Sequence, residues 1–157
     1  MEHLEIERKF LVESDAYKDF TISHTRIVQG FLNTHPERTV RVRIKGTAGF
    51  IAVKGASNHT GTTRFEWEIQ ISVAEATNLI DLCEGVILEK MRHEVPVGAH
   101  TFEVDEFLGE NKGLVIAEIE LGHEDEVFER PQWLGEEVTG DVKYYNSQLS
   151  KNPFSEW

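Results

Sequence analysis

The stretch Glu5-Ile6-Glu7-Arg8-Lys9-Phe10 alternates between two kinds of side chain with a period of two residues. In a β-strand, this period places Glu5, Glu7 and Lys9 on one face and leaves a largely apolar opposite face. An ordinary antiparallel sheet with one solvated face shows the same alternation. The meaning of the stretch therefore depends on what recurs along the rest of the chain.

Paired like charges around one apolar residue recur in five further segments. They are Arg41-Val42-Arg43, Glu66-Trp67-Glu68, Lys90-Met91-Arg92, Glu103-Val104-Asp105 and Glu118-Ile119-Glu120. Acidic pairs of this form number about twice the roughly two that chance predicts for this composition. Each segment carries one sign only, whereas a solvated face more often mixes the signs. Folding would bring opposite signs together across strands, where opposed charges attract.

Period-two segments and turn-like linkers cover most of the chain. They predict eight strands, at 5–12, 25–32, 39–45, 50–54, 64–71, 87–95, 100–107 and 115–121. Helices are expected at 73–84, 123–130 and 141–149. The first of them follows a capping box formed by Ser72 and Glu75. We therefore expect an α+β protein of one domain, residues 1–157, with an eight-stranded antiparallel β-barrel and a few helices packed outside.

The composition limits the classes of partner. With 28 acidic and 16 basic residues the net charge is -12, which argues against broad binding to nucleic acid or to an anionic membrane. No segment approaches the ~20 apolar residues of a membrane span, and the single cysteine, Cys83, excludes an internal disulfide framework. We expect a cytoplasmic protein without nucleic-acid or membrane partners. The sequence leaves the oligomeric state open, and a homodimer is compatible with it.

A closed barrel with the charged positions inward would have a lumen full of charge. The inward acids would be Glu5, Glu7, Glu66, Glu68, Glu103, Asp105, Glu118 and Glu120, and the inward bases Lys9, Arg41, Arg43, Lys54, Arg64, Lys90 and Arg92. Uncompensated buried charges are costly, so this lumen must be wet and must bind something charged. Clustered carboxylates suit Mg2+ or Mn2+, and converging Arg and Lys match phosphate oxygens. A polyphosphate carrying divalent ions satisfies both.

The ordered series of motifs resembles the CYTH superfamily, also called triphosphate tunnel metalloenzymes. The segment from Glu5 to Lys9 has the family form Glu-x-Glu-x-Lys, and the tail from Trp133 to Thr139 followed by Tyr144-Tyr145-Asn146 resembles the short bacterial branch. The resemblance implies a barrel that forms a tunnel and a hydrolase that converts a triphosphate, foremost inorganic triphosphate, to pyrophosphate and phosphate. The alternatives are a class IV adenylate cyclase and a non-catalytic polyphosphate-binding module.

The resemblance also implies roles for individual residues. Metal ligands for Mg2+ or Mn2+ would be Glu5, Glu7, Glu103, Asp105, Glu118 and Glu120. Residues that bind the small-molecule triphosphate would be Lys9, Arg41, Arg43, Lys54, Arg64, Lys90 and Arg92. Catalytic roles would fall to Lys9, Glu118 and Glu120. One position departs from the pattern, because Phe31 stands where bacterial relatives often carry a tyrosine that could orient a water or a phosphate oxygen.

Overall fold

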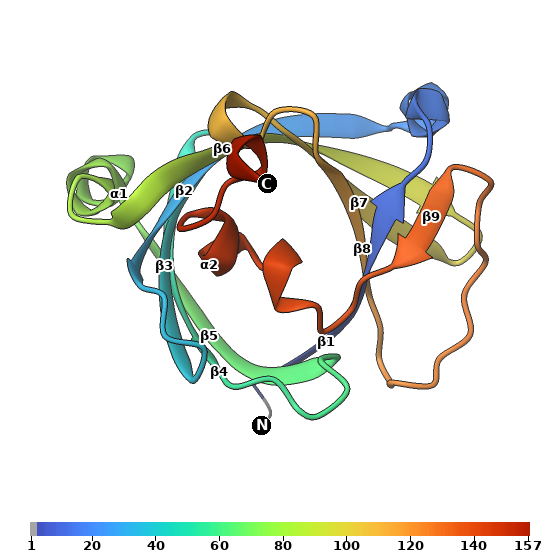
Figure 1. The fold of residues 1–157 in the computed structure, drawn as a ribbon, viewed down its shortest axis with the longest axis horizontal. Coiled ribbons are helices and arrows are strands. Elements are labelled where there is room, and N and C mark those ends of the chain that lie inside the picture. The colour runs from blue at the N-terminus through green and yellow to red at the C-terminus, as the bar shows by residue number, and fades with distance from the viewer. Residues whose placement is uncertain (1–2) are drawn as a thin grey trace.

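The structure is a computed structural model, and it describes residues 3–157. Within that range nine strands form one antiparallel sheet, and pairing of β1 with β5 closes the first eight into a barrel (Figure 1). The strands are β1 (Leu4–Val12), β2 (Ser23–Asn33), β3 (Arg38–Lys45), β4 (Ala48–Gly55), β5 (Thr63–Ile71), β6 (Glu84–Val97), β7 (His100–Phe107), β8 (Val115–Glu120) and β9 (Leu134–Glu137). The predicted barrel is confirmed, and each expected strand overlaps an observed one.

The helical elements are short. They are α1 (Val73–Ile80), α2 (Asn146–Leu149) and the 3-10 turns η1 (Asp15–Phe20), η2 (Gly109–Asn111), η3 (Val142–Tyr144) and η4 (Phe154–Glu156). The predicted capping box opens α1, since the Ser72 hydroxyl accepts from the Glu75 amide and the Glu75 carboxylate accepts from the Ser72 amide. The helix ends at Ile80, short of the predicted end at residue 84, and β6 begins at Glu84. Among the described residues no helix is long and apolar enough to span a bilayer.

The prediction of a helix over 123–130 is wrong, because this segment has no regular secondary structure and links β8 to β9. The Glu126 carboxylate accepts from the Gly122 amide and contacts the imidazole of His100. Phe128 packs edge-on against the rings of Phe10 and Phe102. These tertiary contacts override the weak local preference of an acidic segment for a helix.

Apolar side chains form two cores on opposite faces of the sheet. The outer core consists of Phe10, Tyr17, Val95, Phe102, Val104, Ala117, Ile119, Leu121 and Trp133. The inner core consists of Phe31, Leu88, Phe107, Leu114, Ile116 and Leu149. Side chains alternate across a strand, so Leu88 shares its face of β6 with Lys90 and Arg92. The inner core therefore fills part of the same interior that holds the charged residues.

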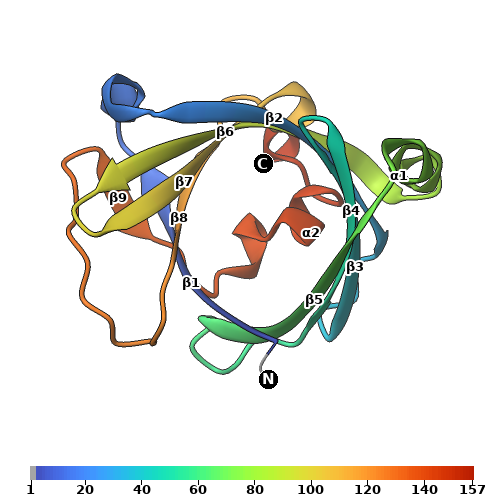
Figure 2. The same cartoon turned by 180° about the vertical axis from the view of Figure 1, so that it is seen from behind.

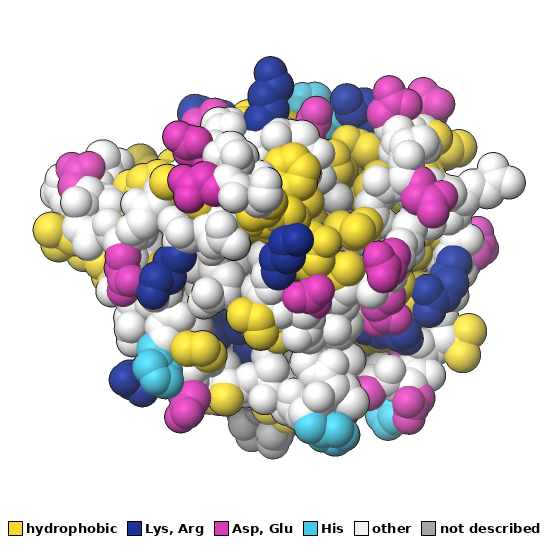
Figure 3. All heavy atoms as spheres, viewed as in Figure 1, with side chains coloured by type: hydrophobic (Ala, Val, Ile, Leu, Met, Phe, Trp, Pro, Cys, Tyr) yellow, Lys and Arg dark blue, Asp and Glu magenta, His cyan; other side chains and the backbone are white. Residues whose placement is uncertain are grey.

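The C-terminal segment enters the barrel. In both views α1 lies outside the ring of strands and α2 lies within it (Figures 1 and 2), so the expectation of helices packed outside holds for α1 and not for α2. The carbonyl of Ser150 accepts from the Val86 amide at 2.8 Å. A Cβ on Gly85, whose φ is +67°, would lie 2.2 Å from that carbonyl oxygen, so only glycine allows this approach. With all atoms drawn, the ring is filled on this face (Figure 3).

Candidate functional site

The barrel interior contains a cavity of about 190 Å³ whose wall is almost entirely charged or polar. Its lining includes every base predicted to bind phosphate and every predicted metal ligand except Asp105. These residues are Glu5, Glu7, Lys9, Arg41, Arg43, Lys54, Arg64, Lys90, Arg92, Glu103, Glu118 and Glu120. The charged faces of the strands thus point inward, as the sequence predicts, and they meet in one place.

Strand β1 changes its pairing strand in the stretch that carries Glu7 and Lys9, which line the cavity. Its start pairs with β5 and its end with β9 along the same edge, and loops fill the interval. In this interval the Glu7 amide donates to the Thr62 carbonyl at 3.0 Å, and the Lys9 amide donates to the Thr139 hydroxyl at 2.9 Å. The backbone of β1 is therefore satisfied while both side chains remain directed inward.

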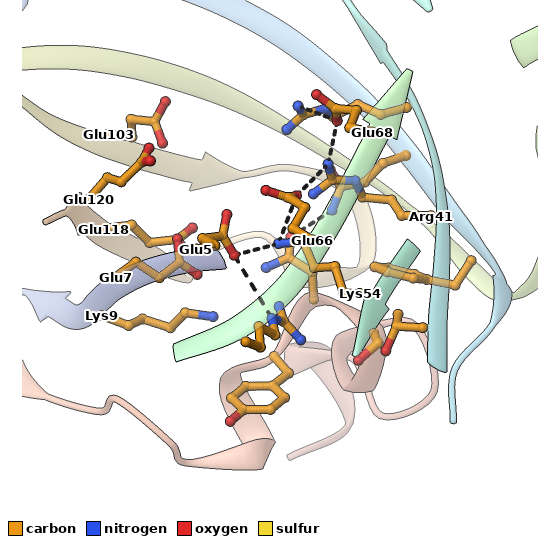
Figure 4. Close-up of a pocket in the computed structure, with 18 of the residues that line it drawn as sticks. Glu5, Glu7, Lys9, Arg41, Lys54, Glu66, Glu68, Glu103, Glu118 and Glu120 are labelled. Atoms are coloured by element: carbon orange, nitrogen blue, oxygen red, sulfur yellow. Dashed lines mark hydrogen bonds and ion pairs between the residues drawn. The ribbon is translucent and has the colours of Figure 1, made fainter. Parts of the chain in front are cut away.

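Carboxylates from β1, β7 and β8 gather on one side of the cavity (Figure 4). We call this group the acidic cluster, and its members are Glu5, Glu7, Glu103, Glu118 and Glu120. Strand register brings them together, because Glu7 lies opposite Glu120 and Glu103 lies opposite Glu118. Directly opposed like charges are destabilising. The cluster therefore favours a proton or a cation that relieves this repulsion.

The pKa values of two neighbouring members of the acidic cluster shift in opposite directions. Burial, and then the charge of Glu118, raises the pKa of Glu7 well above its ordinary value. Burial alone would also raise the pKa of Glu118, but the charges of Lys9, Arg92 and Lys90 hold it below its ordinary value. Glu7 is thus the member that takes up a proton more readily, beside a Glu118 that favours its ionised form. A divalent cation at this position would displace that proton.

The opposite wall carries bases from β3 and β4 that are paired with carboxylates. Arg41 Nη2 lies 2.8 Å from Glu68 Oε2, and Arg43 Nη2 lies 3.2 Å from the same oxygen. Lys54 Nζ donates to Glu5 Oε1 at 3.0 Å. Among the described residues the buried Nε atoms of both arginines have no partner. Burial, and then the charge of Arg41, lowers the pKa of Arg43 to about 10. This wall has donors that a phosphate oxygen could use.

Asp105 lies behind the cavity wall and not in its lining. Its side chain is 1% exposed, and its carboxylate lies 2.8 Å from Lys90 Nζ. Two further hydrogen bonds come from Arg92, at 2.8 and 2.9 Å. Both oxygens are therefore engaged by cations, a placement that differs from the metal-binding role expected from the sequence. Burial lowers the pKa of Lys90 to about 8, although the charge of Asp105 opposes this shift.

Sequence reasoning missed several lining residues. They are Gln29, Thr39, Lys45, Tyr145, Asn146 and Ser147. The phase of the strands could have found Lys45, which continues the alternation of Arg41 and Arg43 along β3. Tyr145 and Asn146 lie on the C-terminal segment, where no strand period indicates an inward direction. Phe31 is 3% exposed and also lines the cavity, so the departure from the family pattern lies at the site itself.

The donor set suits a hard divalent cation, although the described residues hold no ready-made group of three His, Cys, Asp or Glu side chains that could bind a metal. The acidic cluster offers carboxylate oxygens only, which Mg2+ and Mn2+ prefer. Mg2+ commonly binds through one or two carboxylates and takes its other ligands from water and substrate phosphates. The residues present therefore fit a cation that binds together with a phosphate ligand.

Fold and site together define an antiparallel β-barrel whose functional groups face its interior. The chain belongs to the CYTH domain family, whose model matches residues 3–151. An inorganic triphosphatase of Acetivibrio thermocellus is 48% identical over 151 residues, which cover 96% of this chain and 95% of the relative. An inorganic triphosphatase of Nitrosomonas europaea is 38% identical over 151 residues, which cover 93% of this chain and 96% of that relative.

A solved structure agrees with these relatives. The crystal structure of an inorganic triphosphatase matches this chain with a TM-score of 0.68 and 35% sequence identity, and the match covers 93% of each chain. The resemblance inferred from the charged motifs is confirmed, and it extends over nearly the whole chain.

Proposed function

We propose that this protein is a divalent-metal-dependent triphosphatase that hydrolyses inorganic triphosphate to pyrophosphate and phosphate. The observation that carries the proposal is one interior cavity in which the acidic cluster faces bases from β3, β4, β5 and β6. A strongly charged polyanion that carries a cation matches both sides. The relatives named as inorganic triphosphatases support the same substrate.

Binding of triphosphate would replace the internal ion pairs of the cavity. Arg41 and Arg43 share the carboxylate of Glu68, and Lys54 contacts Glu5. Phosphate oxygens can accept hydrogen bonds from the same guanidinium groups in two-pronged fashion. Because the side chains are held on strands, the bases are arranged before the substrate arrives, and less conformational entropy is lost on binding.

Hydrolysis requires attack of water on the terminal phosphorus and departure of pyrophosphate. A divalent cation bound by Glu5, Glu7, Glu118 and Glu120 would polarise phosphate oxygens and lower the pKa of the attacking water. Glu120, which lies opposite Glu7 in the strand register and lines the cavity, would accept the proton of the water. As the bond to pyrophosphate breaks, Lys9 and the bases of the opposite wall would stabilise the negative charge that develops on it.

The lining favours inorganic triphosphate over a nucleotide. Phe31 and Tyr145 carry the aromatic rings of the cavity wall. Phe31 packs within the inner core, and the Tyr145 ring already faces Lys9 and Arg64, whose cationic groups lie 5.3 and 5.7 Å from the ring centroid. An adenine base would need an apolar slot of its own. This supports a triphosphatase over a class IV adenylate cyclase.

A substrate panel tests the proposal. Phosphate release would be measured from inorganic triphosphate, ATP and pyrophosphate, each with Mg2+, Mn2+ or EDTA, together with cyclic AMP formed from ATP. We expect metal-dependent turnover of inorganic triphosphate, its loss in Glu118→Gln, and its retention in Glu136→Gln, a matched control at an exposed position. Cyclic AMP as the main product would replace the proposal with a cyclase. Tight triphosphate binding without release would replace it with a binding module.

The remaining features are part of the same proposal. We infer that residues 1–157 act as one domain in the cytoplasm, where the single Cys83 stays reduced. The net charge of -12 supports a small-molecule partner and neither nucleic acid nor membrane.

A further inference from the structure

Consecutive residues of the C-terminal segment contact a lysine of β1 inside the barrel. Lys9 Nζ donates to the carbonyl of Tyr144 at 3.3 Å. The same ammonium lies 5.3 Å from the centroid of the Tyr145 ring, and the guanidinium of Arg64 lies 5.7 Å from that centroid. Aromatic faces attract cations, and they do so more strongly where water is excluded. The ring of Tyr145 thus holds two bases that line the cavity.

The next residue contacts a lysine of β6. Lys90 Nζ donates to Asn146 Oδ1 at 2.9 Å and lies 2.8 Å from Asp105 Oδ2. An ammonium group has three N–H donors in a fixed tetrahedral arrangement. Two of them are used by these contacts, so the direction of the third is set. Because Lys90 lines the cavity, the remaining donor is the one left for a phosphate oxygen.

Asn146 is itself held in place. Gln29 Nε2 donates to Asn146 Oδ1 at 2.8 Å, and Gln29 is 1% exposed. Because Lys90 also donates to this oxygen, the amide orientation of Asn146 follows from its partners. Among the described residues Gln29 Oε1 has no hydrogen-bond partner although it is buried. A buried acceptor of this kind in the cavity wall is available to a ligand or a water.

The segment that carries these residues is anchored at the end of α2 and after it. Leu149 is fully buried in the inner core, and Ser150 accepts from the Val86 amide at 2.8 Å. Further along, the Phe154 amide donates to Asn111 Oδ1 at 2.8 Å. Such contacts restrict where Tyr145 and Asn146 can lie. The segment therefore holds polar and aromatic groups in the cavity wall.

We propose that Tyr145 and Asn146 are positioning residues, which fix the ammonium groups of Lys9 and Lys90 for contact with the phosphates. This rests on the proposed function, because it names the groups that prepare its binding site. A lysine has a flexible four-carbon stem and directs its charge poorly unless its neighbours restrict it. The strands supply the two lysines, and the C-terminal segment supplies their orientation.

A double-mutant cycle tests the first half of the proposal. The dissociation constant of inorganic triphosphate would be measured by calorimetry in EDTA for Asn146→Ala, Lys90→Ala and the double variant, with kcat and KM measured in metal. Loss of a hydrogen bond to a charged group predicts binding about tenfold weaker in Asn146→Ala. In the Lys90→Ala background the same change should cost less than about twofold, because the residues act as a unit. Gln148→Ala, on the same helix and outside the cavity lining, is the matched control.

A second cycle pairs Tyr145→Leu with Lys9→Ala. We expect the same non-additivity, and we expect Tyr145→Phe to bind triphosphate more tightly than Tyr145→Leu, because the ring and not the hydroxyl faces Lys9. Thermal unfolding of each variant shows whether it folds. Asn146→Leu, which keeps the volume without the acceptor, replaces the alanine variant if the latter unfolds.

The outcomes separate this proposal from the one on which it rests. Losses that add fully in both cycles would overturn it, since a merely structural role acts independently of the lysines. If the wild type hydrolyses triphosphate but Asn146→Ala binds it as tightly as the Gln148→Ala control does, only the positioning proposal would be overturned. Triphosphate binding without hydrolysis would overturn the proposed function. The dissociation constants of the two double-mutant cycles would still test whether Tyr145 and Asn146 position the lysines. Absence of triphosphate binding by wild type would overturn both.

Discussion

Arg92 and Asp105 form a two-pronged hydrogen bond across β6 and β7. The Nε–Oδ1 distance is 2.8 Å and the Nη2–Oδ2 distance is 2.9 Å. The two residues face each other in the strand register, and both are buried. Burial opposes the charge of Asp105, but Arg92 and then Lys90 lower the pKa of this carboxyl below its ordinary value. The carboxylate therefore favours the charged form of Arg92 and opposes the effect of burial on the pKa of Lys90.

Asp105→Asn should destabilise the protein strongly. Removal of this carboxylate leaves Lys90 without its closest counter-charge and leaves Arg92 with only the longer contacts to Glu103 and Glu118, which costs about 3 kcal/mol of unfolding free energy. Urea unfolding at neutral pH measures this loss, with Asp19→Asn at an exposed position as the control. A variant as stable as wild type would contradict the account of the pair.

The same pair predicts sensitivity to acid. Because the folded-state pKa of Asp105 is lowered, its contribution to stability is present above the unfolded-state pKa and is lost as pH falls through the folded-state pKa. Unfolding free energies measured on a descending pH series should fall more steeply for wild type than for Asp105→Asn. Parallel curves would argue against this assignment.

Glu7→Gln should stabilise the metal-free protein at neutral and alkaline pH. The folded-state pKa of Glu7 is raised, so its ionisation is unfavourable in the folded state, and stability falls as pH rises from the unfolded-state pKa through the folded-state pKa. The neutral amide avoids this cost. We expect the thermal midpoint at pH 8 to rise by about 3 °C or more, with loss of triphosphate turnover. A lower midpoint in the variant would contradict this reading of the acidic cluster.

Arg41→Ala should weaken triphosphate binding with little effect on folding. Arg41 lies in the cavity wall, where a guanidinium can contact two phosphate oxygens at once. We expect KM for inorganic triphosphate to rise about tenfold or more. Arg41→Lys should recover only part of the loss, since lysine lacks the planar fork. Arg26→Ala is the matched control, because Arg26 is exposed and pairs with Glu89 on β6. An equal effect of both alanine variants on KM would contradict the assigned role.

The barrel and most of the site could be predicted from the sequence because charge marks the inward face. In an ordinary barrel the inward residues are apolar, and the period alone would not tell which face is functional. Here Arg41-Val42-Arg43 and Glu118-Ile119-Glu120 carry one sign each on the inward side. The opposite side holds Val42 and Ile119, which are buried outside the lumen. The charge pattern therefore predicts both where the strands lie in the sequence and which face of each strand points into the barrel.

The elements that escaped prediction depend on contacts distant in sequence. Strand β9 has the sequence Leu-Gly-Glu-Glu, which shows no alternation and forms a strand only by pairing with the end of β1. The single helix predicted over 141–149 is wrong in its extent, because the extended backbone of Tyr145 separates η3 from α2. Asp105 has the phase of a cavity residue, but burial against Lys90 and Arg92 removes it from the lining. Local pattern carries no information about such partners.

The stoichiometry of triphosphate hydrolysis tests the central claim most directly. Purified protein would be mixed with inorganic triphosphate and Mg2+ or Mn2+, and phosphate and pyrophosphate would be quantified together over time. We predict equal amounts of the two products, no reaction in EDTA, and loss of both products in Glu118→Gln. Persistent turnover in Glu118→Gln, or no turnover of triphosphate by wild type with either metal at any pH, would contradict the claim that the charged interior is a triphosphatase site.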